Sequence, residues 1–356
     1  IDEGLVGSEM CIRDRSMPEH SFSPIEGKLD RFTIDSDLLN NNLGDPTVRE
    51  VIVHIPPSGL EIIDQGHQLP VLIYLAPFTS SGLARAGWKA FAETLPQRHE
   101  RLVREDKMSP TILVLPDCFT SLGGNQFVDS GIMGQWSTWL HQSLKPEISA
   151  RYPTNGRFGL FGKSSGGFGA LHNAIHHPEE WQAIATHSGD VGFDLLYRSE
   201  FSNTATQINK QNGVENFLRY VKQCSKLSGD DFHALMTCAM AASYDSKTEH
   251  SHSYGIRLPF DLETCILDDA LWKNWLAFDP LTSIEQNINS LKSLDLLFID
   301  CGNKDQYGIQ YGSRLMVRML REHNIEHFWE EFDGSHSGIE YRLDYSMPML
   351  AEALQI

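Results

Sequence analysis

A serine between two glycines is the first feature of the sequence able to do covalent chemistry. Gly162-Lys163-Ser164-Ser165-Gly166 has the pattern Gly-x-Ser-x-Gly, between a strand-like run at 157–161 and a helix-like segment at 168–177. A nucleophile elbow requires this strand–turn–helix context, because the sharp turn presents the hydroxyl at the edge of a sheet. Ser164 is therefore the predicted nucleophile. Ser165, one position too late to be central, is the alternative, as is a glycine-rich connection with two incidental serines.

A serine nucleophile needs a base to take its proton and an acid to orient that base, in the chain order serine, acid, histidine. His336 lies in a loop between the last predicted strand and the last predicted helix, and Asp305 follows a predicted strand at 294–300. We predict His336 as the base and Asp305 as the acid. Asp300, expected to end inside the strand, and Asp333, close to His336 in sequence, are the rival acids. A helix-capping histidine and a turn aspartate are the structural alternatives.

Two other patterns indicate cofactor or metal chemistry less well. Gly162-Lys163-Ser164 resembles the end of a phosphate-binding loop, but Arg157 stands where that loop needs its first glycine. The segment 323–327 matches the zinc pattern His-x-x-Glu-His, which requires one continuous helix. Asn324-Ile325 is expected to join a helix to a strand instead. We therefore expect no cofactor and no metal.

Short β-rich runs alternate with helical patterns along the chain, which indicates a mostly parallel sheet with helices on both faces. The runs that predict strands are 48–55, 71–76, 111–115, 157–161, 183–187, 294–300 and 328–332. The segments that predict helices of the core are 136–148, 168–177, 312–323 and 338–354.

Runs typical of strands are absent from 193–278, which is mostly polar. Helical patterns at 214–227 and 230–242 predict that this segment is a lid inserted over the edge of the sheet. We thus expect a core built from 17–192 and 279–356, interrupted by this helical insertion. The first sixteen residues, 1–16, resemble translated sequencing-adapter sequence. They are treated as a non-native leader, with Met17 as the expected start.

Composition narrows the classes of partner. The 29 Lys and Arg against 47 Asp and Glu give a net charge of −18, which opposes binding to nucleic acid or to an anionic membrane. No apolar run approaches the roughly 18 residues that a membrane span needs. Six scattered cysteines without a Cys-x-x-Cys pair favour reduced thiols and a cytoplasmic location. A signal peptide lost upstream is the alternative, and the sequence does not indicate an oligomeric state.

These motifs resemble the putative-esterase family of α/β-hydrolases, which includes esterase D and the S-formylglutathione hydrolases. The resemblance covers about 51–188 and 294–354, and so skips the insertion. Its segments are the nucleophile elbow 162–171, the acid loop 298–307, the histidine loop 334–337 and the oxyanion strand 74–79. It implies an α/β-hydrolase fold and an oxyanion hole made by the backbone N–H groups of Phe78 and Ser165. Pro77 stands where the family has glycine, which is compatible with Phe78 as the donor.

The combined prediction is a serine hydrolase that cleaves a small-molecule carboxylic ester through an acyl-enzyme. An S-formylglutathione-type thioesterase or an acyltransferase on the same scaffold is the alternative, although Ser80 stands where S-formylglutathione hydrolases often carry cysteine. A catalytically silent binding protein is disfavoured, because all three triad residue types are present. Lys163 is expected to be an exposed turn lysine, or else to attract a substrate carboxylate. Packing in the core and an apolar substrate pocket formed together with the lid are equal alternatives for Phe78, Cys118, Phe119, Phe127 and Trp136.

Overall fold

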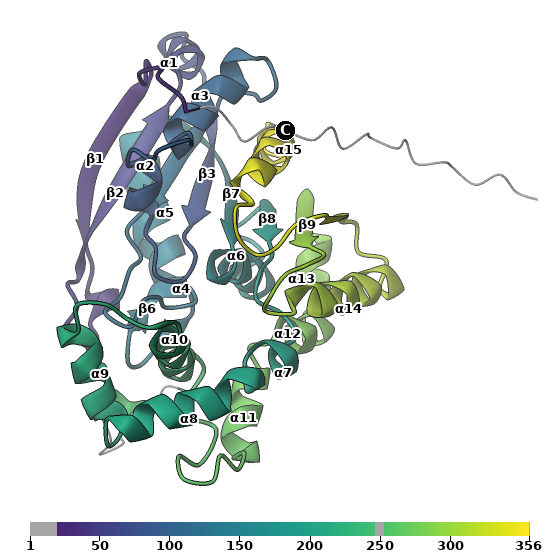
Figure 1. The fold of residues 1–356 in the computed structure, drawn as a ribbon. Coiled ribbons are helices and arrows are strands. Elements are labelled where there is room, and N and C mark those ends of the chain that lie inside the picture. The colour runs from purple at the N-terminus through teal and green to yellow at the C-terminus, as the bar shows by residue number, and fades with distance from the viewer. Residues whose placement is uncertain (1–19, 246–252, 356) are drawn as a thin grey trace, which may run out of the picture.

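An eight-stranded sheet forms the centre of the computed structural model, which describes residues 20–245 and 253–355 (Figure 1). Its strands are β1 Lys28–Asp35, β2 Val48–Ile55, β3 Leu69–Leu75, β4 Ile112–Pro116, β7 Thr154–Lys163, β8 Ala183–His187, β9 Leu296–Gly302 and β10 Phe328–Phe332. β5 Asp129–Ser130 and β6 Gly134–Gln135 pair with each other in a separate hairpin. The predicted leader, 1–16, lies outside the described residues.

The strand order is β1-β2-β4-β3-β7-β8-β9-β10. β1 is antiparallel to β2, and β2 is antiparallel to β4, whereas the pairs from β4 to β10 are all parallel. A mostly parallel sheet is therefore confirmed. In an open parallel sheet the ligand site lies beyond the carboxyl ends of the strands. The loops after β3, β4, β7, β8, β9 and β10 thus become the candidates for holding a site.

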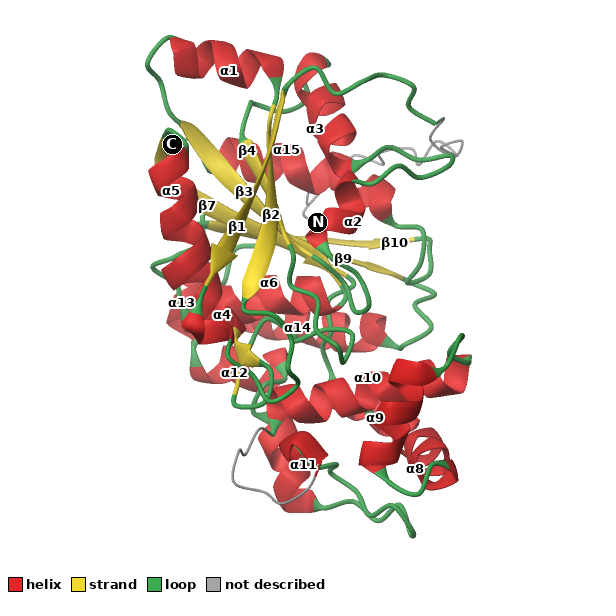
Figure 2. Cartoon of the chain, turned by 90° about the vertical axis from the view of Figure 1, so that its left-hand side faces the viewer, coloured by secondary structure: helices red, strands yellow, loops and turns green. Residues whose placement is uncertain are grey.

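Helices cover both faces of the sheet (Figure 2). The core on one face packs strand residues such as Leu72 and Phe161 against the helices at Leu95–Arg104 and Leu343–Ala353. The other face packs Ile73 and Leu160 against the helices at Lys145–Arg151, Ser165–His176 and Ile309–Glu322. The helices of this core are α1 Pro57–Asp64, α2 Gly82–Ala86, α3 Leu95–Arg104, α4 Trp136–Trp139, α5 Lys145–Arg151, α6 Ser165–His176, α12 Pro280–Gln286, α13 Ile288–Lys292, α14 Ile309–Glu322 and α15 Leu343–Ala353.

Each of the seven predicted strands is present, with bounds within three residues of the observed ones. Every residue of β3, β4 and β8 is buried, so these strands read as continuous apolar runs. The edge strand β1 is missed by the sequence analysis, which expects three strands before residue 117 where the structure has four. Its exposed faces and charged residues Lys28, Asp30 and Arg31 give no apolar run, as is usual at sheet edges.

The segment 193–278 carries helices in place of strands. They are α7 Phe193–Leu196, α8 Phe201–Lys210, α9 Val214–Gln223, α10 Gly229–Tyr244 and α11 Asp269–Leu276. α8 to α11 gather at one end of the sheet in both views (Figures 1 and 2). We keep the name helical insertion for 193–278 as a label for this group of helices; that it is inserted into the core as a lid stays a prediction. No helix within the described residues combines the length and the apolar character needed to cross a bilayer.

Candidate active site

Ser164 lies at the sharp turn between β7 and α6, in the strand–turn–helix setting that the sequence predicts. Its backbone has φ 56° and ψ −125°, a strained conformation for a residue with a side chain. The flanking glycines let the turn approach β3, because a Cβ at Gly162 or Gly166 would lie 2.5 or 2.0 Å from the carbonyl oxygen of Leu75. The N–H of Ser164 donates to the carbonyl oxygen of His187 at 3.0 Å. The serine is thus fixed at the carboxyl edge of the sheet.

Asp305 and His336 are brought together, as predicted. Nδ1 of His336 lies 2.7 Å from Oδ2 of Asp305, and both side chains are buried. A carboxylate only accepts hydrogen bonds, so Nδ1 carries the proton and Nε2 is left as the free base. The loops that carry the pair fit closely, since a Cβ at Gly302 would lie 2.4 Å from the carbonyl oxygen of Gly334.

The hydroxyl of Ser164 is directed to another acid. It donates to Oδ1 of Asp190, in the loop after β8, over 3.3 Å. Among the described residues, no hydrogen bond joins Ser164 to His336. Burial raises the pKa of Asp190, while hydrogen bonds from Gln126 and Tyr197 and the charge of His336 oppose that shift. Asp190 is thus the present partner of Ser164, whereas His336 is bonded to Asp305.

Phe78 and Ser165 line one small cavity of about 10 Å³, together with Pro77 and Ser80. This is about the volume that one water-sized group needs. Ser165 is the first residue of α6, where a backbone N–H has no acceptor within its own helix. The position thus suits a small oxygen that accepts a hydrogen bond. Pro77 contributes no N–H, but it leaves that of Phe78 in place.

Only some of the residues expected to form an apolar pocket line a cavity in the structure. Cys118, Phe127 and Phe78 line the small cavity. Trp136 does not belong to the pocket, because it is fully buried in the core, with its ring 5.7 Å from that of Trp139. Phe119 is an exposed side chain outside the cavity lining.

Lys163, at the end of β7, is half-buried where the sequence predicts an exposed turn residue. Burial lowers the pKa of its amine, while the nearby charge of Glu340 opposes that shift. The expectation of a fully solvated lysine is therefore wrong.

The rival acids are both engaged elsewhere. Asp333 is exposed and pairs with Lys304 at 2.5 Å. Asp300 lies within β9, as expected, and its Oδ1 is 2.8 Å from Nδ1 of His187. Neither carboxylate is a partner of His336 among the described residues.

Asp300 and His187 belong to a second, buried set of serine, histidine and aspartate. Nε2 of His187 lies 2.8 Å from Oγ of Ser346 in α15, and Nε of Arg342 donates to Oδ2 of Asp300 at 2.7 Å. All four side chains are at most 3% exposed. Because no substrate can reach this set without unfolding, we assign it to the structure of the core. We call Ser346, His187 and Asp300 the buried set.

A polar group around Asp190 is missed by the sequence analysis. Oδ2 of Asp190 accepts from Nε2 of Gln126 at 3.0 Å and from the hydroxyl of Tyr197 at 2.8 Å. Nε2 of Gln126 also lies 2.8 Å from the hydroxyl of Tyr244. Only the place of Asp190, just after a buried parallel strand, could have indicated it from the sequence. Its partners come from a loop and from two helical segments far apart in the chain.

The zinc-like segment 323–327 is not on one helix, as expected. α14 ends at Glu322, and Asn324 adopts a φ of 53°. Nδ1 of His327 lies 2.7 Å from the carbonyl oxygen of Ile325.

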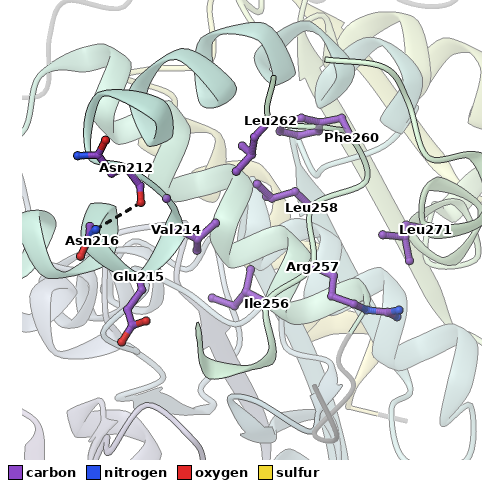
Figure 3. A pocket seen from close by; sticks show the side chains of 11 residues that line it. Asn212, Val214, Glu215, Asn216, Ile256, Arg257, Leu258, Phe260, Leu262 and Leu271 are labelled. Carbon is purple, nitrogen blue, oxygen red and sulfur yellow. Dashed lines mark hydrogen bonds between the residues drawn. The ribbon is translucent and has the colours of Figure 1, made fainter. Parts of the chain in front are cut away.

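A larger hollow of about 510 Å³ lies within the helical insertion (Figure 3). Its wall is mostly apolar, with Val214, Ile256 and Leu258 among the lining residues, and none of the predicted site residues lines it. Arg257 is paired there with Asp245 at 2.6 Å. The hollow therefore offers space without the groups that acyl chemistry needs, and the candidate active site remains at Ser164.

Comparisons with solved structures agree on this architecture. A ferulic acid esterase superposes with a TM-score of 0.58 at 16% identity, covering 93% of this chain and 100% of its own. An S-formylglutathione hydrolase from Agrobacterium tumefaciens gives a TM-score of 0.56 at 16% identity, covering 93% and 97%. FphF, a fluorophosphonate-binding serine hydrolase of Staphylococcus aureus, gives 0.54 at 11% identity, covering 91% and 98%. At these identities the likeness concerns the fold.

The sequence matches no protein in the curated set. The family model described as "Putative esterase", however, matches residues 47–344, which include every predicted catalytic residue. With the mostly parallel sheet and its elbow in place, the chain belongs to the putative esterase family of α/β-hydrolases.

Proposed function

We propose that this protein hydrolyses small-molecule carboxylic esters, with Ser164 as nucleophile, His336 as general base and Asp305 as the acid that orients the base. The observation that carries the proposal is the strained turn of Ser164, in a member of an esterase family. Such strain persists only where the surroundings enforce it, and it clusters at reacting groups. The hydrogen-bonded pair of Asp305 and His336 supports the same assignment.

The reaction begins with rotation of the Ser164 hydroxyl from Asp190 toward Nε2 of His336. Nε2 takes the hydroxyl proton while Oγ attacks the acyl carbon, and Asp305 stabilises the imidazolium that forms. The oxygen of the tetrahedral intermediate accepts hydrogen bonds from the N–H groups of Phe78 and Ser165, whose cavity has room for such an oxygen.

His336 then gives the proton to the leaving alcohol as the carbon–oxygen bond of the ester breaks. Water, deprotonated by the same imidazole, attacks the acyl-enzyme, and the carboxylic acid leaves as Ser164 regains its proton. Each donor of the oxyanion hole contributes about 10²–10³ in turnover where such donors have been removed. The proposal includes action in the cytoplasm, which the free cysteines of the described chain favour.

The test is a pre-steady-state measurement with p-nitrophenyl acetate. We expect the wild-type enzyme to release p-nitrophenol and to form an acetylated serine. We expect His336→Ala to lower the acylation rate on the order of 10⁶-fold, as in dissected triads. His327→Ala is the matched control, because among the described residues this half-buried loop histidine bonds only a nearby carbonyl oxygen. Equal acylation rates in the wild type and His336→Ala would contradict the proposal.

A further inference from the structure

The carboxylate of Asp190 is part of the wall around the nucleophile, although the proposed reaction gives it no role. It is buried, and it stands 3.3 Å from Oγ of Ser164. The helical insertion holds it there, since Tyr197 follows α7 and Tyr244 ends α10. The rings of Tyr197 and Tyr244 lie 6.1 Å apart, and each packs against Trp275 of α11. A well-packed support of this kind fixes the direction of the carboxylate.

The two oxygens of this carboxylate are unequally satisfied. Oδ2 accepts two short hydrogen bonds, from Gln126 and Tyr197. Oδ1 accepts one long bond, from the hydroxyl of Ser164. An ionised carboxylate has about four acceptor sites, and a buried one is costly unless they are used. Once Ser164 turns away to attack a substrate, Oδ1 has no other donor among the described residues.

A second buried acceptor is found at the same place. Gln126 lines the small cavity beside Ser165 and is fully buried, and its Oε1 has no hydrogen-bond partner within the described chain. A buried acceptor without a donor is costly. The small cavity has room for one oxygen, which the proposed mechanism assigns to the acyl carbonyl, so a donor on the substrate is expected at Oδ1 of Asp190.

The position of Oδ1 restricts where that donor can be on the substrate. Oγ of Ser164 becomes bonded to the acyl carbon, so a group on the adjacent carbon is only three covalent bonds from Oγ. Oδ1 is itself within hydrogen-bonding distance of Oγ. A hydroxyl on the carbon next to the carbonyl is therefore within reach of Oδ1, whereas one at the far end of a long acyl chain is not.

We propose that Asp190 is a specificity-determining residue that accepts a hydrogen bond from a 2-hydroxyl group on the acyl part of the substrate. This inference rests on the proposed function, because it needs Ser164 to form the acyl-enzyme. The substrate class is then esters of 2-hydroxy acids, and the helical insertion contributes to selectivity by holding Asp190 through Tyr197.

Asp190→Asn gives a sharp test, because it changes the chemistry at one position with little change of shape. The amide oxygen is expected to take the place of Oδ2, where Gln126 and Tyr197 donate. The amide NH₂ then replaces Oδ1 and faces Ser164. An acceptor beside the acyl group thereby becomes a donor.

The experiment measures kcat/KM for three p-nitrophenyl esters: 2-hydroxyacetate, 2-methoxyacetate and propionate. Each value is divided by the rate constant for hydrolysis of the same ester by hydroxide. This division corrects the comparison for differences in the intrinsic reactivity of the three esters. We expect the wild type to favour the hydroxyacetate over the other two esters. In Asp190→Asn we expect the ratio of hydroxyacetate to methoxyacetate to fall about 10- to 100-fold, the range for a hydrogen bond to a charged group.

Asp279→Asn is the matched control. Asp279 is also a buried acid whose pKa burial raises, but it accepts from the backbone N–H groups of Gly192 and Phe193, and no hydrogen bond joins it to Ser164 among the described residues. We expect it to leave the ratio among the esters unchanged.

An unchanged ratio in Asp190→Asn, or an equal loss on all three esters, would overturn the inference, since the latter is the result of a merely structural role. Failure of the proposed function gives a different result, in which the wild type hydrolyses none of the esters in a manner that depends on Ser164, and both proposals then fall.

Discussion

Two sets of serine, histidine and aspartate lie in this protein, and the one with complete hydrogen bonds is the one that cannot react. In the buried set, His187 bonds both Ser346 and Asp300 at 2.8 Å. In the candidate site His336 bonds Asp305, while Ser164 points to Asp190. Hydrogen-bond connectivity alone would favour Ser346 over the proposed nucleophile, Ser164.

The two serines differ in their backbone conformation and in whether a substrate can reach them. Ser346 occupies the interior of α15, a position without strain, and it is fully buried. Ser164 takes a strained conformation at the end of a parallel strand, beside a cavity that suits a carbonyl oxygen. Arg342 also forms an ion pair with Asp300 in the buried set, so the negative charge of Asp300 is already balanced within the core. A site for acyl transfer is thus recognised by what surrounds the three residues.

The largest expected effect separates the two serines. Ser164→Ala should lower kcat for p-nitrophenyl acetate on the order of 10⁶-fold, as loss of a nucleophile does in dissected triads. Ser346→Ala removes a hydroxyl of the same type from the buried set, and it should retain turnover close to that of the wild type. Steady-state kinetics on both purified variants checks this. The comparison fails if Ser346→Ala is the inactive variant.

The next effect separates Asp305 from its rival. Asp305→Asn should lower kcat about 10⁴-fold, because the amide favours the wrong tautomer of the histidine. Asp300→Asn should instead act on the fold, since it removes the negative partner of the buried Arg342. We expect it to lower the free energy of unfolding by about 3 kcal/mol, as breaking a buried ion pair does. Urea titration together with kinetics distinguishes the two variants, and a greater loss of kcat in Asp300→Asn would reverse the assignment.

The smallest expected effect is the contribution of Asp190 to the pH dependence of the free energy of unfolding. Because burial raises its pKa in the folded protein, ionisation is harder there than in the unfolded chain. The resulting cost is absent below the unfolded pKa of about 4 and grows as pH rises through the folded pKa. Asp190→Asn should therefore be more stable than the wild type at pH 7, with the gap closing at acid pH. Thermal unfolding at several pH values measures it; a gap that widens toward acid pH contradicts this sign.

Much of the core could be predicted because its signals are local. The ranges for β2, β8 and β10 match the structure, since these strands appear in the sequence as short apolar or alternating runs. The edge strand β1 could not be found in this way, because its pairing with β2 depends on contacts that its own sequence does not encode. α1 and α3 are missed as well, although Thr94 and Gln97 form a capping box at the start of α3.

The candidate site likewise contains residues that the sequence predicts and residues that it does not. Ser164, Asp305 and His336 each stand in a short motif with a fixed order along the chain, so the amino-acid sequence alone is enough to propose them. Asp190 and its partners follow no such pattern, because Gln126, Tyr197 and Tyr244 meet only when the helical insertion folds against the core. Sequence therefore predicts the proposed reacting groups better than the residues to which we assign substrate selectivity.

Covalent labelling with a serine-directed fluorophosphonate, followed by peptide mass spectrometry, would decide whether Ser164 is the reacting group. We predict one stoichiometric adduct on Ser164, lost in Ser164→Ala and retained in Ser346→Ala. An adduct on Ser165 or Ser346, or none on the active enzyme, would contradict this assignment.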